Sequence, residues 1–428
     1  MFGDTPLVLV ETHDDLLRCV EQLGRARVIG VDTESDSFHH YREKVCLVQI
    51  SDQHTDFVID PLRVPDMGPL GEVFANRNIC KVFHGADYDV VCLKRDFGVK
   101  MVNIFDTMIS AQFLALPRVG LADLIHTWWG WHLDKKWQRH DWASRPLLPE
   151  HLDYARGDSH WLPTLRDLFL RRLQQVGQLA PVLEECEVLE SREWVRPRHD
   201  PADFYRVKGS RQLDELGQRA LRAVYRFRDT EAERQDRPAF KVLPEEILYE
   251  LAVSRPQSME ALNETFRRGA PFIRRYGEGI VAALREGVTS TDPLPTVADA
   301  PKREPGLRGP RAERLMNSLK DWRNAVVQRT GLPPIAVASN GVLKELTRVA
   351  PRTVEGLSEV PELRRWQAAQ YGGEWVELIN RVLGPERVEG EESGEPEASG
   401  GGGRRRRRRR GEAPAAAEAE SVLAESAE

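Results

Sequence analysis

The first part of the chain alternates short apolar runs with amphipathic stretches. Four runs rich in β-branched residues and bounded by polar or turn-forming residues predict strands: VIGVD, KVCLVQIS, TDFVID and CKVFHG. Between them, DDLLRCVEQL and YDVVCLKRDFG space their apolar residues by three and four, which predicts helices. This alternation predicts an α/β domain with a mixed sheet. The segment that follows, up to about residue 200, is predicted to be mostly helical.

The second part of the chain shows only helical periodicity, and its pattern repeats. Residues recur at one constant offset without a gap, which predicts two copies of one small helical domain. The matched positions are Phe227-Arg228 with Trp322-Arg323, Pro238 with Pro333, Val242 with Val337, Leu248 with Leu343, Leu251 with Leu346, Pro256 with Pro351 and Leu262 with Leu357. The Pro-rich polar stretch TSTDPLPTVADAPKREPGLRGP between the copies is typical of a linker.

These patterns predict five segments. The tail contains the run Arg404 to Arg410 among Gly, Glu and Ala, and its composition favours disorder. The predicted segments are an α/β domain with a helical extension (1–208), a first helical domain (209–290), a linker (291–310), a second helical domain (311–384) and the Gly/Arg/Glu/Ala-rich tail (385–428).

Composition narrows the class of protein. The 428 residues are 41% hydrophobic and 30% charged, with a formal net charge of −6, which suits a soluble chain of several domains. The five cysteines show no C-x-x-C spacing, which argues for reduced thiols and against a disulfide framework or a zinc site. Because no secretory signal and no apolar run of roughly 18 residues is evident, we expect a cytoplasmic protein without a membrane partner.

Three carboxylates follow directly on the predicted strand VIGVD: Asp32, Glu34 and Asp36. Side chains two residues apart on a strand point to the same face, so Asp32 and Glu34 are expected side by side. Two adjacent carboxylates are hard to keep ionised unless a cation lies between them, and a hard divalent ion is the natural occupant. Taken alone, the same triplet DTE is also compatible with a solvated turn.

Two other segments could supply partners for this pair. In YARGDSHWL, Tyr154 and Asp158 lie one helical turn apart, where a phenol and a carboxylate could orient a water together. The alternative is a core tyrosine and a capping or surface aspartate. In CKVFHGADYDVVCL, Asp87 and Asp89 suit a helix N-terminus, or one of them could be a ligand. Spacing alone does not choose between these possibilities.

The motifs VDTE, HGADYD and YARGD, in that order, resemble the three exonuclease motifs of the DEDDy group of 3′–5′ exonucleases. The segments CLVQIS, IFDTMISAQFL and LDKKWQRHDWASRPL are similar to those of the ribonuclease D family in particular. The doubled helical unit resembles the HRDC domain, found in ribonuclease D and in RecQ-type helicases. The resemblance implies an α/β RNase H-like exonuclease domain with a mixed sheet, then two all-α HRDC helical domains, with a disordered tail outside the family pattern.

Carried over residue by residue, the resemblance implies five catalytic residues. Asp89 is chosen in the second motif because the family's ligand falls five residues after the histidine, here His84, and Tyr154 marks the tyrosine group instead of the sister DEDDh group. The five are Asp32, Glu34, Asp89, Tyr154 and Asp158. Three further carboxylates have no catalytic counterpart in the family, namely Asp36, Asp87 and Asp106.

The implied chemistry is phosphodiester hydrolysis with two divalent cations, Mg²⁺ or Mn²⁺, roughly 4 Å apart. In this hypothesis Asp32 bridges both ions. Glu34 and Asp158 complete the site for the attacking water, which Tyr154 orients. Asp89 holds the leaving-group side. All-oxygen ligands suit these ions, whereas Zn²⁺ would favour His or Cys.

Contacts with the nucleic acid are predicted from local composition. Candidate neighbours of the terminal nucleotide are Thr33, Phe38, His84 and Gln112. Trp128, Trp129 and Trp137 could stack bases or anchor their loops. The stretch FRRGAPFIRRYGEG suggests backbone contacts through Arg267, Arg268, Arg274 and Arg275, although exposed arginines are often only a solvated face, and the second copy carries ELRRWQ. The Arg-rich tail could add nonspecific contacts to RNA or to other anionic partners, or fold back on the acidic stretches beside it.

We therefore expect a monomeric 3′–5′ exoribonuclease that trims structured RNA, with tRNA precursors as the family-typical substrate, and releases nucleoside 5′-monophosphates. Two alternatives are a 3′–5′ DNA exonuclease and a non-catalytic nucleic-acid binding scaffold. The intact set of five motif residues argues against the scaffold. The sequence has no G-x-x-x-x-G-K-[ST] loop, which argues against an ATP-driven helicase.

Overall fold

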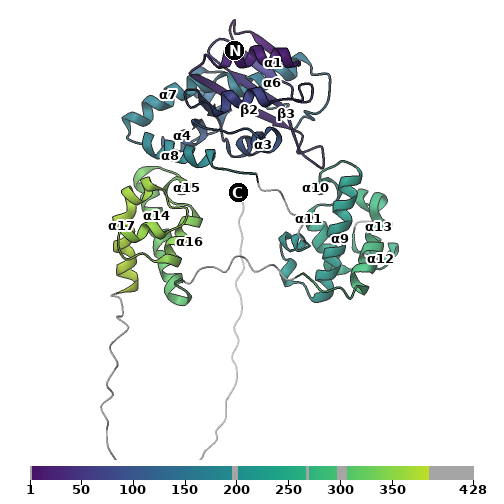
Figure 1. The fold of residues 1–428 in the computed structure, drawn as a ribbon. Helices are drawn as coiled ribbons and strands as arrows, with labels where there is room; N and C mark the ends of the chain where they lie inside the picture. Colours follow the sequence, from purple (N-terminus) through teal and green to yellow (C-terminus); the bar gives the residue numbers. More distant parts are fainter. Residues whose placement is uncertain (1, 195–200, 267–268, 296–305, 385–428) are drawn as a thin grey trace, which may run out of the picture. The chain divides into compact units, whose positions relative to one another are not determined.

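The computed structural model describes residues 2–194, 201–266, 269–295 and 306–384. The N-terminal domain is built on a six-stranded sheet in the order β1-β4-β3-β2-β5-β6 (Figure 1). Strand β3 runs antiparallel to both of its neighbours, and the other pairs are parallel, so the predicted mixed sheet is confirmed. The strands are β1 (Leu7–Val10), β2 (Val28–Ser35), β3 (Val45–Ser51), β4 (Asp56–Ile59), β5 (Cys80–Phe83) and β6 (Ile104–Asp106).

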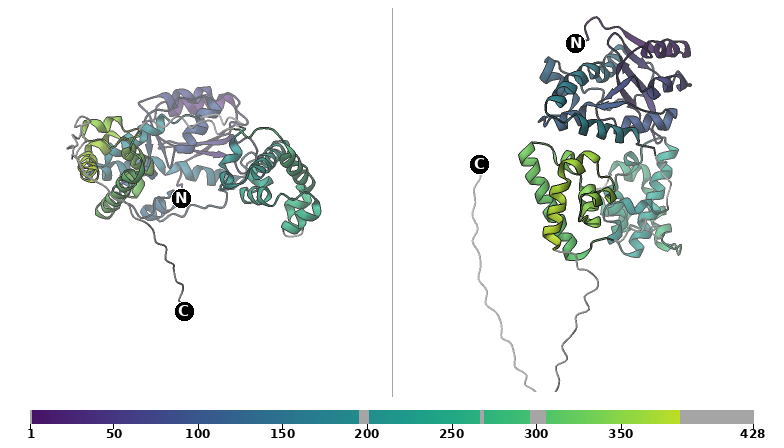
Figure 2. Two further views of the ribbon diagram at one scale, coloured as in Figure 1. Left: turned by 90° about the horizontal axis from the view of Figure 1, so that it is seen from below. Right: turned by 60° about the vertical axis from the view of Figure 1, so that its left-hand side comes forward.

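Helices cover both faces of this sheet. On one face, apolar residues of α1, α2 and α3 form a core with Ile29 and Val31 of β2. On the other face, α6 lies against β2, β3 and β4, and α7 lies against β2 and β5. Figure 2 shows helices packed around the sheet. The helices of this domain are α1 (His13–Leu23), α2 (Gly68–Ala75), α3 (Asp87–Phe97), α4 (Thr107–Phe113), α5 (Leu121–Trp129), α6 (Pro149–His160), α7 (Leu162–Gln175) and α8 (Leu179–Glu190).

Gly30 allows the junction between α6 and α7 to lie directly on β2. A Cβ atom at Gly30 would stand 2.3 Å from the Ser159 carbonyl oxygen and 3.0 Å from Leu162 Cβ. Side chains alternate along a strand, so Asp32 and Glu34 share the face of Gly30, which is the face that α6 covers. The missing side chain therefore brings α6 close to the acidic end of β2.

The two helical domains repeat each other element by element. Helices α10 and α11 of the first domain recur as α15 and α16 at the same offset as the sequence repeat, and each second helix ends in a left-handed residue, Arg255 (φ 49°) and Ala350 (φ 48°). The elements are α9 (Glu215–Arg234), α10 (Ala239–Val242), α11 (Glu245–Ser254), α12 (Met259–Thr265) and α13 (Pro271–Thr289), then α14 (Gly309–Thr330), α15 (Pro334–Val337), α16 (Asn340–Val349), the 3₁₀ turn η3 (Glu355–Glu359) and α17 (Arg365–Leu383).

Two short 3₁₀ turns, η1 (Asp203–Arg206) and η2 (Ser210–Gln212), precede the first helical domain. Within the described residues, every helix is too short or too polar to cross a membrane.

A Gly30→Ala substitution tests the close approach of α6. The added methyl group meets a backbone oxygen, which cannot move aside as a flexible side chain would, so we expect the free energy of unfolding to fall by about 1–3 kcal/mol. Urea denaturation measures the change. Gly373→Ala in α17 is the matched control, since a Cβ there meets no atom within 4 Å. Equal stability of Gly30→Ala and the parent protein would contradict the packing described for β2.

Candidate active site

Strand β2 carries the first two acidic residues of the site. Ile29 and Val31 are buried and anchor the strand in the core. Pairing with β3 continues along the acidic residues, with Asp32 opposite Gln49 and Glu34 opposite Leu47. The register shifts between Glu34 and Ser35, where the strand ends. Asp32 and Glu34 are therefore held on regular strand backbone.

Helix α6 brings the third carboxylate to this pair. Oxygen atoms of Asp32, Glu34 and Asp158 all lie within 4.8 Å of one another. This cluster unites two residues of a strand with a residue more than 120 positions later in the chain. Carboxylate oxygens at this separation match the donor set that a hard divalent ion takes.

Tyr154 precedes Asp158 by one turn of α6 and is partly buried. Burial, followed by the negative charges of Asp158, Glu34 and Asp32, holds the pKa of its hydroxyl well above the ordinary value. The phenol is therefore protonated at neutral pH, where it can donate a hydrogen bond to an oxygen at the site.

Asp89 stands in the first turn of α3, on the opposite side of β2. It is 9% exposed, lies outside the three-carboxylate cluster and accepts a hydrogen bond from the Thr33 hydroxyl at 2.5 Å. Thr33 alternates with Asp32 and Glu34 along the strand, so its side chain reaches toward α3 while theirs face α6. Thr33, which is predicted to contact the substrate, thus fixes the Asp89 carboxylate through this hydrogen bond.

The carboxylates of the site repel one another in a buried setting. Burial raises the pKa of Asp158 to about 7, and the charge of Asp89 adds to the shift. Burial likewise raises the pKa of Asp89 to about 6, against the opposing hydrogen bond from Thr33. For Asp32 and Glu34, burial and the neighbouring carboxylates together hold both pKa values well above their ordinary range. A divalent cation would relieve this repulsion, and the oxygen donors fit Mg²⁺ or Mn²⁺.

Two other predicted contacts with the terminal nucleotide, His84 and Gln112, are not members of the three-carboxylate cluster. His84 is partly buried, its Nδ1 lies 2.9 Å from the Thr107 hydroxyl, and burial lowers its pKa to about 4. Gln112 lines a cavity together with Gly85 and Asp106, and this lining contains none of the three clustered carboxylates.

Two of the predicted basic contacts, Arg267 and Arg268, lie outside the described residues. Arg274 and Arg275 lie exposed in the first turns of α13. The aromatic candidates are packed in loops or helices: Trp128 contacts Phe169 edge to face, and Trp137 contacts His151 in the same way. Packing against protein favours the anchoring interpretation for these two rings.

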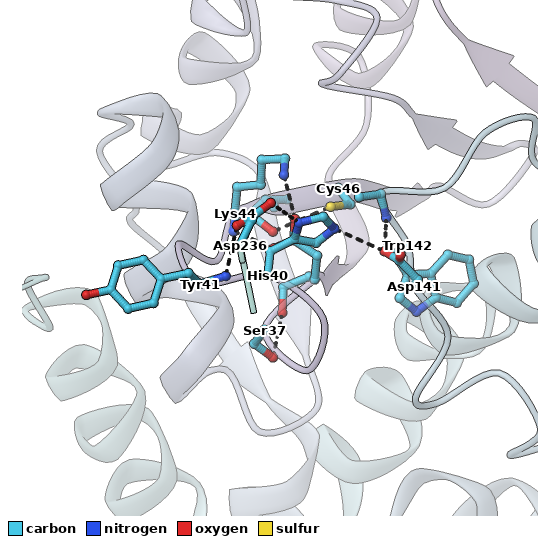
Figure 3. Close-up of polar contacts among 12 residues, drawn as sticks. Ser37, His40, Tyr41, Lys44, Cys46, Asp141, Trp142 and Asp236 are labelled. Atoms are coloured by element: carbon cyan, nitrogen blue, oxygen red, sulfur yellow. Dashed lines mark hydrogen bonds and ion pairs between the residues drawn. The ribbon is translucent and has the colours of Figure 1, made fainter. Parts of the chain in front are cut away.

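Asp36 is fully buried just beyond β2. Its carboxylate accepts hydrogen bonds from the Lys44 backbone N–H at 2.8 Å and from Lys44 Nζ at 2.6 Å, which closes the loop between β2 and β3. In the same loop, His40 Nδ1 lies 2.7 Å from an oxygen of Asp236, and the Tyr41 backbone N–H donates to Asp236 at 3.1 Å (Figure 3). Asp36 is thus a structural carboxylate, in agreement with its lack of a catalytic counterpart.

Sequence reasoning missed the residues that surround Tyr154. Trp142 is 1% exposed and stacks on Tyr154, with ring centroids 5.8 Å apart and an interplanar angle of 29°. Arg145 pairs with the buried Asp60 at the end of β4. The segment DWASRP, which carries Trp142 and Arg145, resembles a family segment, but its local pattern gives no sign that it lies beside Tyr154.

Comparison with known proteins agrees with this architecture. Residues 7–174 match the family model described as 3'-5' exonuclease, and residues 217–284 and 312–379 each match the HRDC domain model. The catalytic core of RRP6 from Trypanosoma brucei is a similar solved structure, with a TM-score of 0.60 and 29% identity, covering 68% of this chain and 82% of that one. Escherichia coli RNase D shares the fold, with a TM-score of 0.64 and 23% identity over 87% of this chain and 98% of that one.

Fold and domain matches define a 3′–5′ exonuclease domain followed by two HRDC domains. Ribonuclease D of Gluconacetobacter diazotrophicus is 31% identical over 375 residues, which are 87% of this chain and 92% of that protein. The chain belongs to the ribonuclease D family, and it is a 3′–5′ exoribonuclease. The family predicted from the three motifs is confirmed.

Similarity also extends to larger eukaryotic proteins. The exosome complex component 10 homolog of Caenorhabditis elegans is 35% identical over 260 residues, but the match spans 60% of this chain and only 30% of that protein.

The raised pKa values predict that divalent ions stabilise the protein in a pH-dependent way. Asp89 and Asp158 bind protons more tightly in the folded than in the unfolded state, so their contribution to stability is complete below about pH 4 and is lost as pH rises through about 6 to 7. Above this range the ionised carboxylates bind a divalent cation without competition from protons. We expect MgCl₂ or MnCl₂ to raise Tm more at pH 8 than at pH 5, measured by differential scanning fluorimetry.

The control for this measurement is Asp158→Asn, which removes one ligand and should abolish most of the metal-induced rise in Tm at pH 8. A rise of equal size at both pH values would show that the ion binds away from these carboxylates.

Proposed function

We propose that this protein removes nucleotides one at a time from the 3′ end of structured RNA, with tRNA precursors as substrates, in a two-metal reaction that releases nucleoside 5′-monophosphates. The observation that carries the proposal is the cluster of Asp32, Glu34 and Asp158 within 4.8 Å, beside Tyr154. Membership of the ribonuclease D family supports RNA as the substrate.

The roles of the side chains follow from their positions. Asp32, Glu34 and Asp158 would hold divalent ions, which when bound supply an acidified water and charge stabilisation for the phosphate. The charges of Asp89, Asp158 and Glu34 all act on Asp32, so Asp32 would suit a ligand that two ions share. Asp89, fixed by Thr33, would complete the leaving-group side.

Tyr154 acts as a hydrogen-bonding group in this proposal. Burial, together with the negative charges around the hydroxyl, keeps the pKa of Tyr154 raised, so a phenolate is not available as a base at neutral pH. A neutral hydroxyl one helical turn from Asp158 can orient the attacking water, and proper orientation lowers the barrier by fixing the reacting geometry.

The test uses 5′-labelled RNA with a free 3′ end, with and without Mg²⁺ or Mn²⁺. The parent protein should produce a ladder that shortens from the 3′ end and should release nucleoside 5′-monophosphates. Loss of an outer-shell residue typically costs about 10- to 100-fold in metal affinity or activity, so the direct ligand variants Asp32→Asn and Asp158→Asn should each lose more than about 100-fold.

RNA binding separates catalysis from folding in these variants. Both substitutions replace a carboxylate by a neutral group of similar shape, so RNA affinity should stay close to that of the parent protein. Near-normal turnover by either variant would contradict the proposed site. A matched DNA oligonucleotide measures the preference for RNA, and equal cleavage of both would contradict RNA as the specific substrate.

The first HRDC domain is proposed to add affinity for the RNA backbone. Arg274 and Arg275 present two exposed positive charges on α13, whereas the positions at the repeat offset in the second HRDC domain are Ala369 and Gln370. Cationic side chains bind phosphates and release counterions, which makes the affinity depend on salt. The two HRDC domains therefore differ in charge at equivalent positions.

The double substitution Arg274→Gln and Arg275→Gln should weaken RNA binding. Each lost phosphate contact should reduce the slope of log affinity against log salt by about 0.7 for single-stranded RNA. Fluorescence anisotropy at several salt concentrations measures both effects. The charge-matched control is the double substitution Arg329→Gln and Arg381→Gln, which removes two exposed arginines that are paired with Glu374 and Glu377. An unchanged salt slope would show that α13 does not contact the RNA.

A further inference from the structure

The ring of Tyr154 is directed by an aromatic contact. Its phenol ring stacks on the indole of Trp142 at 5.8 Å and 29°, so the indole face sets the plane in which the phenol can lie. The Tyr154 hydroxyl is at the far end of this ring, so a small rotation of the ring displaces the hydroxyl most. The face of Trp142 therefore limits where the hydroxyl can be.

Trp142 is itself immobilised. The indole is 1% exposed and belongs to a small core with Cys46, Leu47, Val58 and Ala155. This core joins β3 and β4 to α6, so it is continuous with the sheet that carries Asp32 and Glu34. Figure 3 shows the Trp142 indole beside Asp141. The Trp142 indole thus holds the Tyr154 phenol in a defined position relative to the sheet.

Arg145 fixes the backbone that carries Trp142. Its guanidinium donates to the Trp142 carbonyl at 2.7 Å, to the Cys46 carbonyl of β3 at 3.1 Å and to both oxygens of Asp60 at 2.6 and 2.8 Å. Asp60 is fully buried directly after β4. Two hydrogen bonds to one carboxylate fix the orientation of the planar guanidinium of Arg145. Its remaining N–H groups therefore point to β3 and to the loop that carries Trp142.

We propose that Trp142 is a positioning residue for Tyr154 and that the Arg145–Asp60 pair holds Trp142 in place. The inference rests on the role proposed for Tyr154 and deepens it, because it assigns the origin of the hydroxyl's orientation. The hydrogen bonds of Arg145 go to Asp60 and to the carbonyls of Trp142, Ser144 and Cys46, none of which is a clustered carboxylate. Trp142 and the Arg145–Asp60 pair affect catalysis only by fixing the direction of the Tyr154 side chain.

The test is a double-mutant cycle between Trp142→Leu and Tyr154→Phe in the full-length protein. Leucine fills part of the space but offers no flat face. Misplacing a catalytic group by about 1 Å can cost up to about 100-fold in rate, so Trp142→Leu should lower kcat about 10-fold with KM little changed. In the Tyr154→Phe background, where there is no hydroxyl to position, the same substitution should cost less than about 2-fold.

Direct Mn²⁺ binding, measured by electron paramagnetic resonance of free Mn²⁺, supplies a readout besides activity. Affinity for Mn²⁺ should be the same in Trp142→Leu and in the parent protein, because the carboxylates are untouched. Equal losses of kcat in both backgrounds, no loss in Trp142→Leu, or a weakened affinity for Mn²⁺ would each overturn the inference. A Tyr154→Phe variant with full activity would overturn it too, whereas inactivity of Asp158→Asn would still support the proposed hydrolysis.

Two further variants keep the test decisive if Trp142→Leu folds poorly. Arg145→Lys keeps the positive charge but loses the branched guanidinium that contacts Asp60, β3 and Trp142 at once. Its effect on kcat should therefore depend on Tyr154 in the same way as that of Trp142→Leu. Trp161→Leu removes an indole at the end of α6 that packs on Trp129. Its effect on kcat should be the same in both Tyr154 backgrounds, and absence of coupling for Arg145→Lys would count against the inference.

Discussion

Repulsion among partly buried carboxylates is the constraint to which the rest of the exonuclease domain is fitted. Asp32, Glu34 and Asp158 are held within 4.8 Å of one another, and the charges that raise the pKa values of Asp32 and Glu34 are all carboxylates. Left alone, such a cluster would move apart or take up protons. The fold must therefore hold α6 against β2 with contacts located elsewhere, and a bound divalent cation would relieve the repulsion that remains.

Those contacts lie on the strands beyond the site. Arg156 and His160 of α6 both bond to the buried Asp56 of β4, and the Ser159 hydroxyl lies 2.8 Å from the Ser51 hydroxyl of β3. A buried ion pair stabilises little in net terms, but breaking it is costly, so it fixes position well. The arginines next to α6, Arg156 and Arg145, are in this way paired with Asp56 and Asp60 and not with the clustered carboxylates.

The sequence predicts the sheet and the repeat well because both depend on local periodicity. The strands VIGVD, KVCLVQIS, TDFVID and CKVFHG are β2 to β5. The predicted strands do not include β1 and β6, and β6, at three residues, is too short to carry a clear pattern. The HRDC repeat is visible because its spacing is maintained residue by residue. Matches to the HRDC model at 217–284 and 312–379 preserve that spacing.

The site is only partly accessible from the sequence. Spacing places Asp32 beside Glu34, but the choice of Asp89 came from the family resemblance, and the five site residues stay predictions until tested. Strand alternation would also align Asp36, yet the register shift after Glu34 ends the alternation and turns Asp36 into a buried loop residue. The pair Arg145 and Asp60 joins positions 85 residues apart, a separation at which no local pattern indicates contact.

Anomalous diffraction from crystals grown with Mn²⁺ tests most directly whether the clustered carboxylates form a divalent-metal centre. We predict anomalous density among Asp32, Glu34 and Asp158, with a second peak toward Asp89 when an RNA 3′ end is bound, and loss of the first peak in Asp158→Asn. Density confined to other parts of the protein, in crystals of an enzyme that hydrolyses RNA with Mn²⁺, would contradict the proposed centre.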